Sequence, residues 1–148
     1  MLTVPLSKGF SAQIDESDSW ILSGNKWVAS KNGTGVYAVR NSGTKRVYMH
    51  RMIMNAQDGQ LVDHVNSDTL DNRRLNLRIC TKQQNAFNMK PRATGHKGVS
   101  FLHGKWKARL MFNKKTVSLG SHNTFAEATR AYDVAAERLF GEFARTNA

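Results

Sequence analysis

The strongest constraint on the fold is a group of polar residues at fixed spacings in the middle of the chain. Asp63 and His64 are followed by Asn76, twelve residues after the histidine, and by Asn85, nine residues further on. The apolar pair at 61–62 precedes Asp63 directly, which is typical of a strand end, where neighbouring side chains point to opposite sides. Of two adjacent polar side chains at a strand end, one can bind a metal ion while the other faces water.

A second signal follows shortly after this strand. Thr81 and Gln84 have the spacing of a capping box, which places Asn85 in the first turns of a short helix. The segment therefore predicts a β-hairpin followed by a helix.

The residue types favour a metal site that acts on phosphodiesters. A carboxylate from the hairpin, Asp63, and an amide oxygen from the helix, Asn85, are hard oxygen ligands suited to Mg²⁺ or Mn²⁺ that keeps several waters and takes a phosphate oxygen. Arg73, Arg74 and Arg78 lie in the same stretch, and we expect one or more of them to position phosphates.

The overall charge indicates a polyanionic partner. The 148 residues contain 22 Lys and Arg against 11 Asp and Glu, a net charge of +11, which favours nucleic acid first and an anionic membrane surface second. No apolar run approaches the roughly 20 residues that span a bilayer, and the first residues lack the pattern of a signal peptide, so we expect a cytoplasmic protein that does not use a membrane.

Cysteine usage excludes two kinds of site. Cys80 is the single cysteine, which excludes an internal disulfide and a zinc site built from cysteines. We expect its side chain to be buried in a strand.

The first 48 residues alternate short β-like runs with turn signals and predict a small antiparallel sheet. The runs are SAQID, SWILSG, KWVAS, VYAVR and KRVYM. Trp20, Trp27, Tyr37 and Tyr48 are expected to be core and cross-strand packing residues rather than ligand-binding residues.

A domain boundary is predicted at residues 89–95, where Pro91 and Gly95 occur with little apolar content. Residues 96–122 then predict three short strands, with turns at His103-Gly104 and Asn113-Lys114. Three strands cannot bury an apolar face alone, so they need a further element.

A helix is predicted after the three strands and covers the apolar face of their sheet. Thr124 and Glu127 form a capping box, and Gly141 marks the helix end. The apolar residues at helical spacing are Phe125, Ala128, Tyr132, Ala135 and Leu139. The helix is expected to lie across one face of the sheet and to leave the other face open.

The open face has a strong charge bias. Seven basic residues and no acidic one occur from Arg92 to Lys115, interleaved with Phe101 and Trp106, which favours phosphate contact. A merely solvated, solubilising sheet face is the alternative.

The middle of the chain resembles the HNH nuclease family, of the type found in phage and mobile-intron endonucleases, with asparagine as the third motif letter. The resemblance covers about residues 48–88 and rests on Asp63, His64, Asn76 and Asn85, with the HRMIM and DNRRLNLR stretches. It implies catalytic roles for His64 as general base and Asn76 as the brace of the hairpin loop, and it makes Asp63 and Asn85 the metal ligands. A histidine of ordinary pKa near ~6.5 is partly neutral at working pH, which suits a base. For His50 in the HRMIM stretch, structural support or phosphate contact is expected ahead of direct catalysis.

Residues 96–147 resemble the Apetala-two or ethylene-response-factor DNA-binding domain of plant regulators. The resemblance rests on Lys97-Gly98-Val99, Gly104-Lys105-Trp106, Leu119-Gly120, the helix with Ala131-Tyr132-Asp133, and Asn147. It implies that the sheet enters the major groove and that the DNA-binding residues are Lys97, Ser100, Lys105, Trp106, Lys107 and Arg109. Arginines are usual in that family at the positions of Lys97 and Ser100, so the family's preferred DNA sequence does not carry over.

Together these features predict an α+β fold: a small N-terminal antiparallel sheet leads into a ββα-metal HNH core at residues 1–90, and a three-stranded antiparallel sheet packed on one α-helix follows at 94–148. The predicted function is a metal-dependent endonuclease of double-stranded DNA that uses Mg²⁺ or Mn²⁺. As a monomer or weak dimer it would nick one strand per site, in a bacterial or phage-infected cell. Two alternatives stay open: a non-catalytic, sequence-specific DNA-binding regulator that retains an HNH scaffold, and an RNA-binding structural protein.

Overall fold

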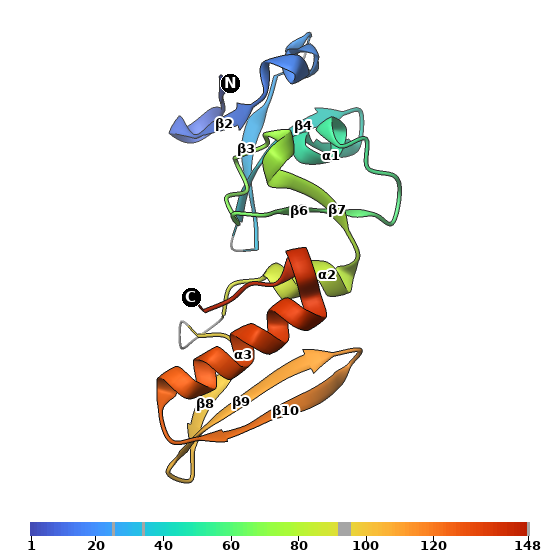
Figure 1. The fold of residues 1–148 in the computed structure, drawn as a ribbon. Coiled ribbons are helices and arrows are strands. Elements are labelled where there is room, and N and C mark those ends of the chain that lie inside the picture. Colours follow the sequence, from blue (N-terminus) through green and yellow to red (C-terminus); the bar gives the residue numbers. More distant parts are fainter. Residues whose placement is uncertain (25, 34, 92–95, 148) are drawn as a thin grey trace. The chain divides into compact units, whose positions relative to one another are not determined.

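The protein, described here from a computed structural model, divides into two compact units, Met1–Lys82 and Gln83–Ala148 (Figure 1). The structure describes residues 1–24, 26–33, 35–91 and 96–147. Its class is α+β with small antiparallel sheets, as predicted, and no helix in these ranges is long and apolar enough to cross a membrane.

The first unit contains three antiparallel sheets of two or three strands. They pair β1 with β2, β3 with β4 and β5, and β6 with β7. The strands are β1 Leu2–Pro5, β2 Ser11–Ile14, β3 Val28–Asn32, β4 Gly35–Ser42, β5 Lys45–Tyr48, β6 Leu61–His64 and β7 Leu77–Cys80. The helices are the 3-10 turns η1 Ser7–Gly9, η2 Glu16–Leu22 and η3 Arg74–Asn76, with the short α-helix α1 Met49–Ile53.

One apolar core joins these small sheets. Its most enclosed members come from different elements: Ile14 from β2, Ile21 from η2, Ala38 from β4 and Met49 from α1. A two-stranded sheet alone is at best marginally stable in water, so packing on this shared core stabilises these small sheets.

The antiparallel sheet predicted for the first 48 residues is present, with two differences. Strand β1 was not predicted, and the SWILSG run forms part of the 3-10 helix η2 instead of a strand. The helix buries Asp18 and Ile21 and turns Trp20 outward, where the Trp20 side chain is 49% exposed. The prediction that Trp20 is a core residue was wrong, whereas Trp27 is buried as expected.

The second unit has the predicted three strands, β8 Val99–Leu102, β9 Lys105–Phe112 and β10 Lys115–His122, in the order β10-β9-β8. Both turns fall where expected. His103 and Gly104 have positive φ angles of 51° and 72°, and Asn113 and Lys114 have 49° and 62°, so each turn has two consecutive left-handed residues. Such turns match the right-handed twist of the strands that they join.

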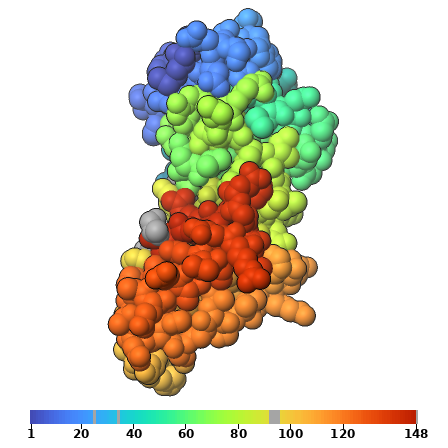
Figure 2. Space-filling model, in the orientation of Figure 1, coloured from blue at the N-terminus to red at the C-terminus, as the bar shows by residue number. Residues whose placement is uncertain are grey.

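Helix α3, Phe125–Phe140, lies across one face of this sheet (Figure 1) and forms a continuous layer in the space-filling view (Figure 2). The predicted capping box of Thr124 and Glu127 is confirmed, and the short 3-10 turn η4 Gly141–Phe143 follows the helix. The buried face consists of Ala128, Tyr132, Ala136 and Phe140. Leu139 was predicted on this face but is 38% exposed, because the Phe140 ring takes the last core position.

Helix α2, Lys82–Asn88, lies almost entirely in the second unit. The Phe87 ring stacks on Phe140, with centroids 3.7 Å apart, and lies 6.4 Å from Phe112. This packing explains why the division between the compact units falls inside α2, after Lys82. The domain boundary at residues 89–95 stays a prediction, and residues 92–95 lie outside the described residues.

Gly98 is the most tightly enclosed of the described glycines of the second unit. A Cβ atom there would lie 2.2 Å from Cδ2 of Tyr132 and 2.3 Å from the carbonyl oxygen of Arg109, at a φ of +70°. We expect Gly98→Ala to lower the stability of this unit by about 3 kcal/mol, from overpacking plus left-handed strain. Hydrogen exchange of the β9 amides measures this loss.

Gly104 provides the matched control. It has a similar φ of +72°, but no atom lies within 4 Å of its Cβ position, so Gly104→Ala carries the strain without the clash. We expect a loss of about 1–2 kcal/mol for this variant. Equal losses in the two variants would contradict the steric explanation.

Candidate active site

The β6–β7 hairpin presents Asp63 and His64, both buried, at the end of β6. Asp63 lies directly opposite Arg78 in the strand register. The Arg78 guanidinium donates from Nε and Nη2 to the same carboxylate oxygen, Oδ2, at 2.9 and 2.7 Å. The carboxylate that the sequence predicts as a metal ligand is therefore held by a cation of the neighbouring strand.

The imidazole of His64 is oriented by Asn72, which is almost fully buried. The Asn72 Nδ2 atom donates to the Leu70 carbonyl at 3.2 Å and contacts Sδ of Met49 at 3.6 Å, so the amide oxygen faces Nε2 of His64 at 3.3 Å. An amide oxygen only accepts hydrogen bonds. In the neutral ring, Nε2 therefore carries the proton and Nδ1 carries the lone pair.

Burial favours the neutral form of this histidine. It lowers the pKa of His64 below its ordinary value, although the hydrogen bond with Asn72 and the carboxylates around the ring act in the opposite direction. A neutral imidazole is the form that can accept a proton.

An aromatic cluster packs around the same ring. His50 of α1 lies 5.1 Å from His64 between ring centroids, and Tyr37 of β4 lies 6.3 Å from His64 and 5.6 Å from His50. Tyr48 lies 5.5 Å from His50. Burial, with the nearby His64 and Arg51, lowers the pKa of His50 to about 3, and burial also raises the pKa of Tyr37. His50 is thus an uncharged packing partner of His64, which agrees with structural support.

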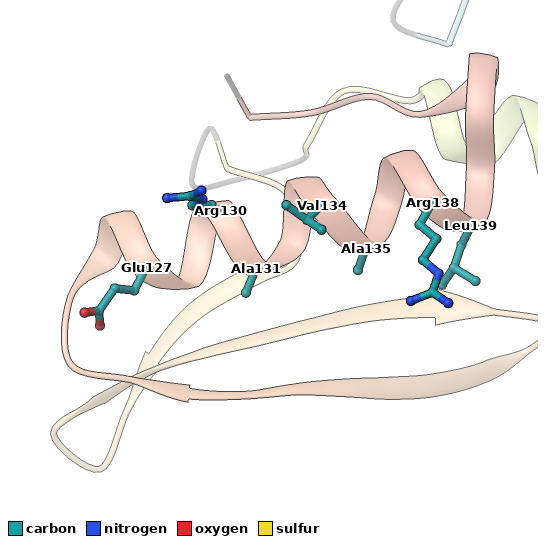
Figure 3. Close-up of a pocket in the computed structure, with 7 residues that line it drawn as sticks. All are labelled: Glu127, Arg130, Ala131, Val134, Ala135, Arg138 and Leu139. Carbon is teal, nitrogen blue, oxygen red and sulfur yellow. The ribbon is translucent and has the colours of Figure 1, made fainter.

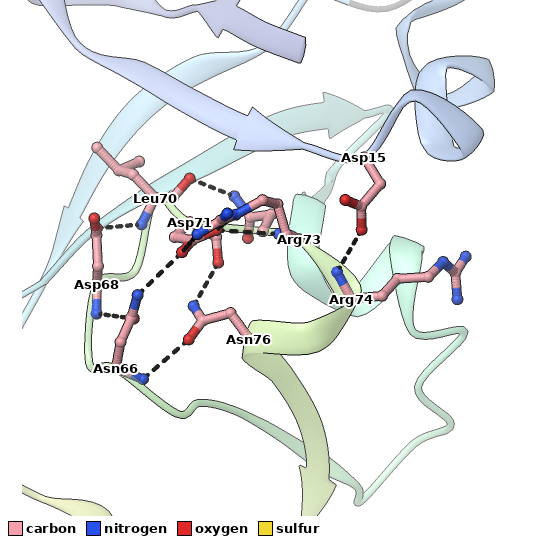
Figure 4. Close-up of polar contacts among 9 residues, drawn as sticks. Asp15, Asn66, Asp68, Leu70, Asp71, Arg73, Arg74 and Asn76 are labelled. Carbon is pink, nitrogen blue, oxygen red and sulfur yellow. Dashed lines mark hydrogen bonds and ion pairs between the residues drawn. The ribbon is translucent and has the colours of Figure 1, made fainter. Parts of the chain in front are cut away.

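Asn76 braces the loop that joins β6 to β7 (Figure 4). Its Nδ2 donates to the Asp71 carbonyl at 2.8 Å, and its Oδ1 accepts from the backbone N–H of Asn66 at 2.9 Å. Asn66 in turn donates to the Asp71 carboxylate at 3.0 Å. The two ends of the loop are thereby tied together around one buried amide.

The loop is also fixed to the elements that surround it. Gln13 of β2 exchanges two backbone hydrogen bonds of 2.8 Å with Leu70 and Asn72. The Thr69 hydroxyl donates to the Val36 carbonyl of β4 at 2.6 Å. The N-terminal hairpin and β4 thus hold the segment that carries Asn72 against His64.

The three arginines predicted to contact phosphates each pair with a carboxylate of the first unit. Arg73 pairs with Asp71 at 2.7 Å. Arg74 pairs with Asp18 at 2.6 Å, and Arg78 pairs with Asp63 at 2.7 Å. The backbone N–H of Arg74 also donates to the Asp15 carboxylate at 2.8 Å (Figure 4). Hydrogen bonds from Arg73 lower the pKa of Asp71.

Asn85 lies on α2 and is partly buried within the second unit. Asp63 belongs to the first unit and Asn85 to the second, and no three His, Cys, Asp or Glu side chains of the described ranges gather as a metal cage. A carboxylate and an amide oxygen are each hard donors of the kind that Mg²⁺ and Mn²⁺ accept. Cys80 is buried in β7, as predicted, and burial raises the pKa of its thiol.

The candidate DNA-binding residues of the second unit separate into two groups. Lys105, Lys107 and Arg109 alternate on β9 with the core residues Ala108 and Leu110, so they lie on the face opposite α3. Ser100 on β8 pairs with Lys107 and shares that face.

The other two residues are engaged elsewhere. Trp106 lies on the α3 side of the sheet, 4.9 Å from the ring of Phe125, and Lys97 donates from Nζ to the carbonyls of Ala86 and Phe87 at the end of α2. Burial lowers the pKa of Lys97 to about 8.

A pocket of about 680 Å³ lies along α3 (Figure 3). Its lining residues are Glu127, Arg130, Ala131, Val134, Ala135, Arg138 and Leu139. It includes none of the predicted site residues and offers no histidine or cysteine, so it does not compete as a catalytic site.

Sequence reasoning did not identify Asn72 as a site residue. It stands eight residues after His64 in a stretch rich in Asn and Asp, and the hydrogen bond between the two is visible only in the folded hairpin. Residue type and spacing do not distinguish it from its neighbours Asn66 and Asp71.

The low pKa of His50 predicts how stability depends on pH. Between about pH 6.5 and about pH 3 the unfolded chain binds a proton at His50 and the folded chain does not. The stability of the first unit therefore falls as the pH falls through this range. We expect His50→Gln to reduce this slope by up to about 1.4 kcal/mol per pH unit. Urea unfolding at several pH values measures the slope.

The control is His103→Asn, at an exposed turn position of positive φ that asparagine tolerates. A slope that is the same in the His50 and His103 variants would show that His50 does not cause the pH dependence.

Comparisons with known proteins agree with this site. The sequence profile described as HNH endonuclease matches residues 47–87, which contain the hairpin, His64 and α2 up to Phe87. A protein named as an uncharacterized HNH endonuclease of Acanthamoeba polyphaga mimivirus is 34% identical over 138 residues, covering 88% of this chain and 71% of the relative. The chain thus belongs to the HNH endonuclease family and is a hydrolase of phosphodiester bonds in DNA.

Proposed function

We propose that this protein is a metal-dependent endonuclease of double-stranded DNA in which His64 is the general base and Asp63 and Asn85 hold the metal. The observation that carries the proposal is the buried imidazole of His64, next in sequence to the buried Asp63 carboxylate at the end of β6. Such a pair matches the requirements of water activation next to a cation-binding oxygen.

The proton transfer is assigned to a particular ring nitrogen. Because Asn72 faces Nε2 of His64, Nδ1 is the atom that takes the proton from the attacking water. Mg²⁺ or Mn²⁺ held by Asp63 and Asn85 would supply charge stabilisation at the phosphate and at the leaving 3′ oxygen. Asn76 keeps the loop, and with it Asn72, in place.

The C-terminal domain, residues 94–148, is proposed to bind DNA through the open face of its sheet, in the manner of the Apetala-two type. Support comes from the alternation on β9, which puts Lys105, Lys107 and Arg109 on the face that α3 leaves uncovered. In this division of work the sheet provides affinity and some sequence preference, and the nuclease domain at 1–90 provides the chemistry. One site attacks one strand, so the expected product of a monomer is a nick. We also propose that the protein comes from a phage or a mobile element.

The decisive experiment is cleavage of supercoiled plasmid in Mg²⁺, Mn²⁺ or EDTA by the wild-type protein and by His64→Ala. We expect nicked plasmid that requires metal, and a loss of at least about 100-fold in rate when the base is removed. His50→Gln, which alters a packing partner of the same ring, is the comparison variant and should retain more activity.

Two results would count against this proposal. Equal rates for His64→Ala and the wild type would remove His64 as the base. DNA binding without cleavage under every metal would support the non-catalytic regulator instead.

The sheet proposal predicts a change in salt dependence. We expect Arg109→Gln to weaken binding to a short duplex and to reduce the slope of log affinity against log salt by about 0.9, the value for one lost phosphate contact. Fluorescence anisotropy over a series of salt concentrations measures the slope.

Arg130→Gln provides the same change of charge on α3, which covers the opposite face of the sheet. Its slope should stay at the wild-type value. Equal reductions in both variants would mean that net charge, and not the open face, sets DNA affinity.

A further inference from the structure

The ion pair of Asp63 and Arg78 differs from the two other arginine pairs of the site. The Arg78 and Asp63 side chains are 13% and 8% exposed, whereas the Arg73 and Arg74 side chains are 42% and 50% exposed. Solvent screens the charges of the exposed pairs, but it screens a buried pair far less. Of these three arginines, Arg78 is thus the one whose side chain is least exposed to solvent.

This pair opposes a cation at Asp63. The carboxylate and the guanidinium together are neutral, and a divalent ion on Asp63 would stand next to a buried positive charge. Like charges within about 4–6 Å disfavour one another strongly where the effective dielectric constant is low. In addition, Arg78 donates from Nε and from Nη2 to Oδ2, an oxygen that the ion would use.

A DNA phosphate removes this opposition. It adds negative charge, and a guanidinium binds phosphate with two parallel hydrogen bonds as well as it binds carboxylate. An arginine that turns from Asp63 to a phosphate would release the carboxylate to the metal.

We propose that Arg78 couples metal binding to DNA binding: without DNA it occupies Asp63 and keeps the affinity for divalent cations low, and with DNA it transfers to a phosphate. The inference rests on the proposed function, in which Asp63 is a metal ligand. Because coupling between two sites is reciprocal, the metal must also tighten DNA binding by the same factor. Such an enzyme would assemble its metal site on DNA and would bind divalent cations only weakly without DNA.

The test measures Mn²⁺ affinity by calorimetric titration, with and without a short duplex. Three proteins are compared, and all carry His64→Ala so that the duplex stays intact. The first has no other change and is called the background, the second adds Arg78→Gln, and the third adds Arg78→Lys. In the background we expect the duplex to tighten Mn²⁺ binding by a factor in the range of about 5–150 that coupled sites show.

The two Arg78 variants should diverge. Arg78→Gln removes the charge, so we expect Mn²⁺ binding without DNA to be tighter than in the background by a similar factor, and the duplex to add little. Arg78→Lys keeps the charge and should bind Mn²⁺ without DNA as weakly as the background does. An unchanged Mn²⁺ affinity in Arg78→Gln, or equal tightening by the duplex in the background and in Arg78→Gln, overturns the inference.

Thermal unfolding distinguishes a change in Mn²⁺ binding from a folding defect of the Arg78 variant. Arg78→Gln leaves the buried Asp63 charge without its guanidinium, so this variant should melt lower than the background in EDTA and regain more with Mn²⁺. The double variant Asp63→Asn with Arg78→Gln has neither charge and should gain nothing from Mn²⁺. An Arg78→Gln protein that gains no more than the background from Mn²⁺ contradicts the coupling.

The failure of this inference can be told from failure of the proposed function. If the wild type nicks plasmid with metal and Arg78→Gln shows no altered Mn²⁺ binding, the inference alone is wrong. If no protein binds Mn²⁺ and the wild type does not cut, the metal role of Asp63 is wrong and the inference with it.

Discussion

The geometry of the site depends on one buried amide. Asn76 donates to the Asp71 carbonyl and accepts from the Asn66 backbone, which closes the loop between β6 and β7. This closure sets the place of Asn72, and Asn72 sets which nitrogen of His64 carries the proton. A buried polar group that lost such bonds would be left without water to replace them, so the bonding of the loop is enforced by burial itself.

The charges of the first unit are organised around the same loop. Three carboxylates, Asp18, Asp63 and Asp71, are buried, and each is paired with an arginine of the β7 region. In the structure, which contains no DNA, those arginines are engaged within the protein. The proposed sheet interface of the second unit, with Lys105, Lys107 and Arg109 on its open face, would add attraction for a polyanion.

Local patterns predicted the elements well and their partners poorly. The apolar pair at 61–62 and the spacing of Thr81 and Gln84 predicted a hairpin and a helix. The capping box at Thr124 and the turn signals predicted α3 and the hairpins of the second unit. The pairs Arg74–Asp18 and Thr69–Val36 join residues 56 and 33 positions apart, and no local pattern contains such information. The strand predicted at Trp20 is part of η2 instead, the helix in which the buried Asp18 pairs with the distant Arg74.

Helix α2 has a consequence for how this chain evolved. The stretch that matches the HNH endonuclease profile, residues 47–87, extends past the division between the units, since Phe87 packs into the core of the second unit with Phe112 and Phe140. The inherited sequence motif and the cooperative folding unit therefore have different borders. Exchange of the C-terminal domain by recombination just after the motif would separate Phe87 from its aromatic partners, so the two halves of this enzyme are constrained to evolve together.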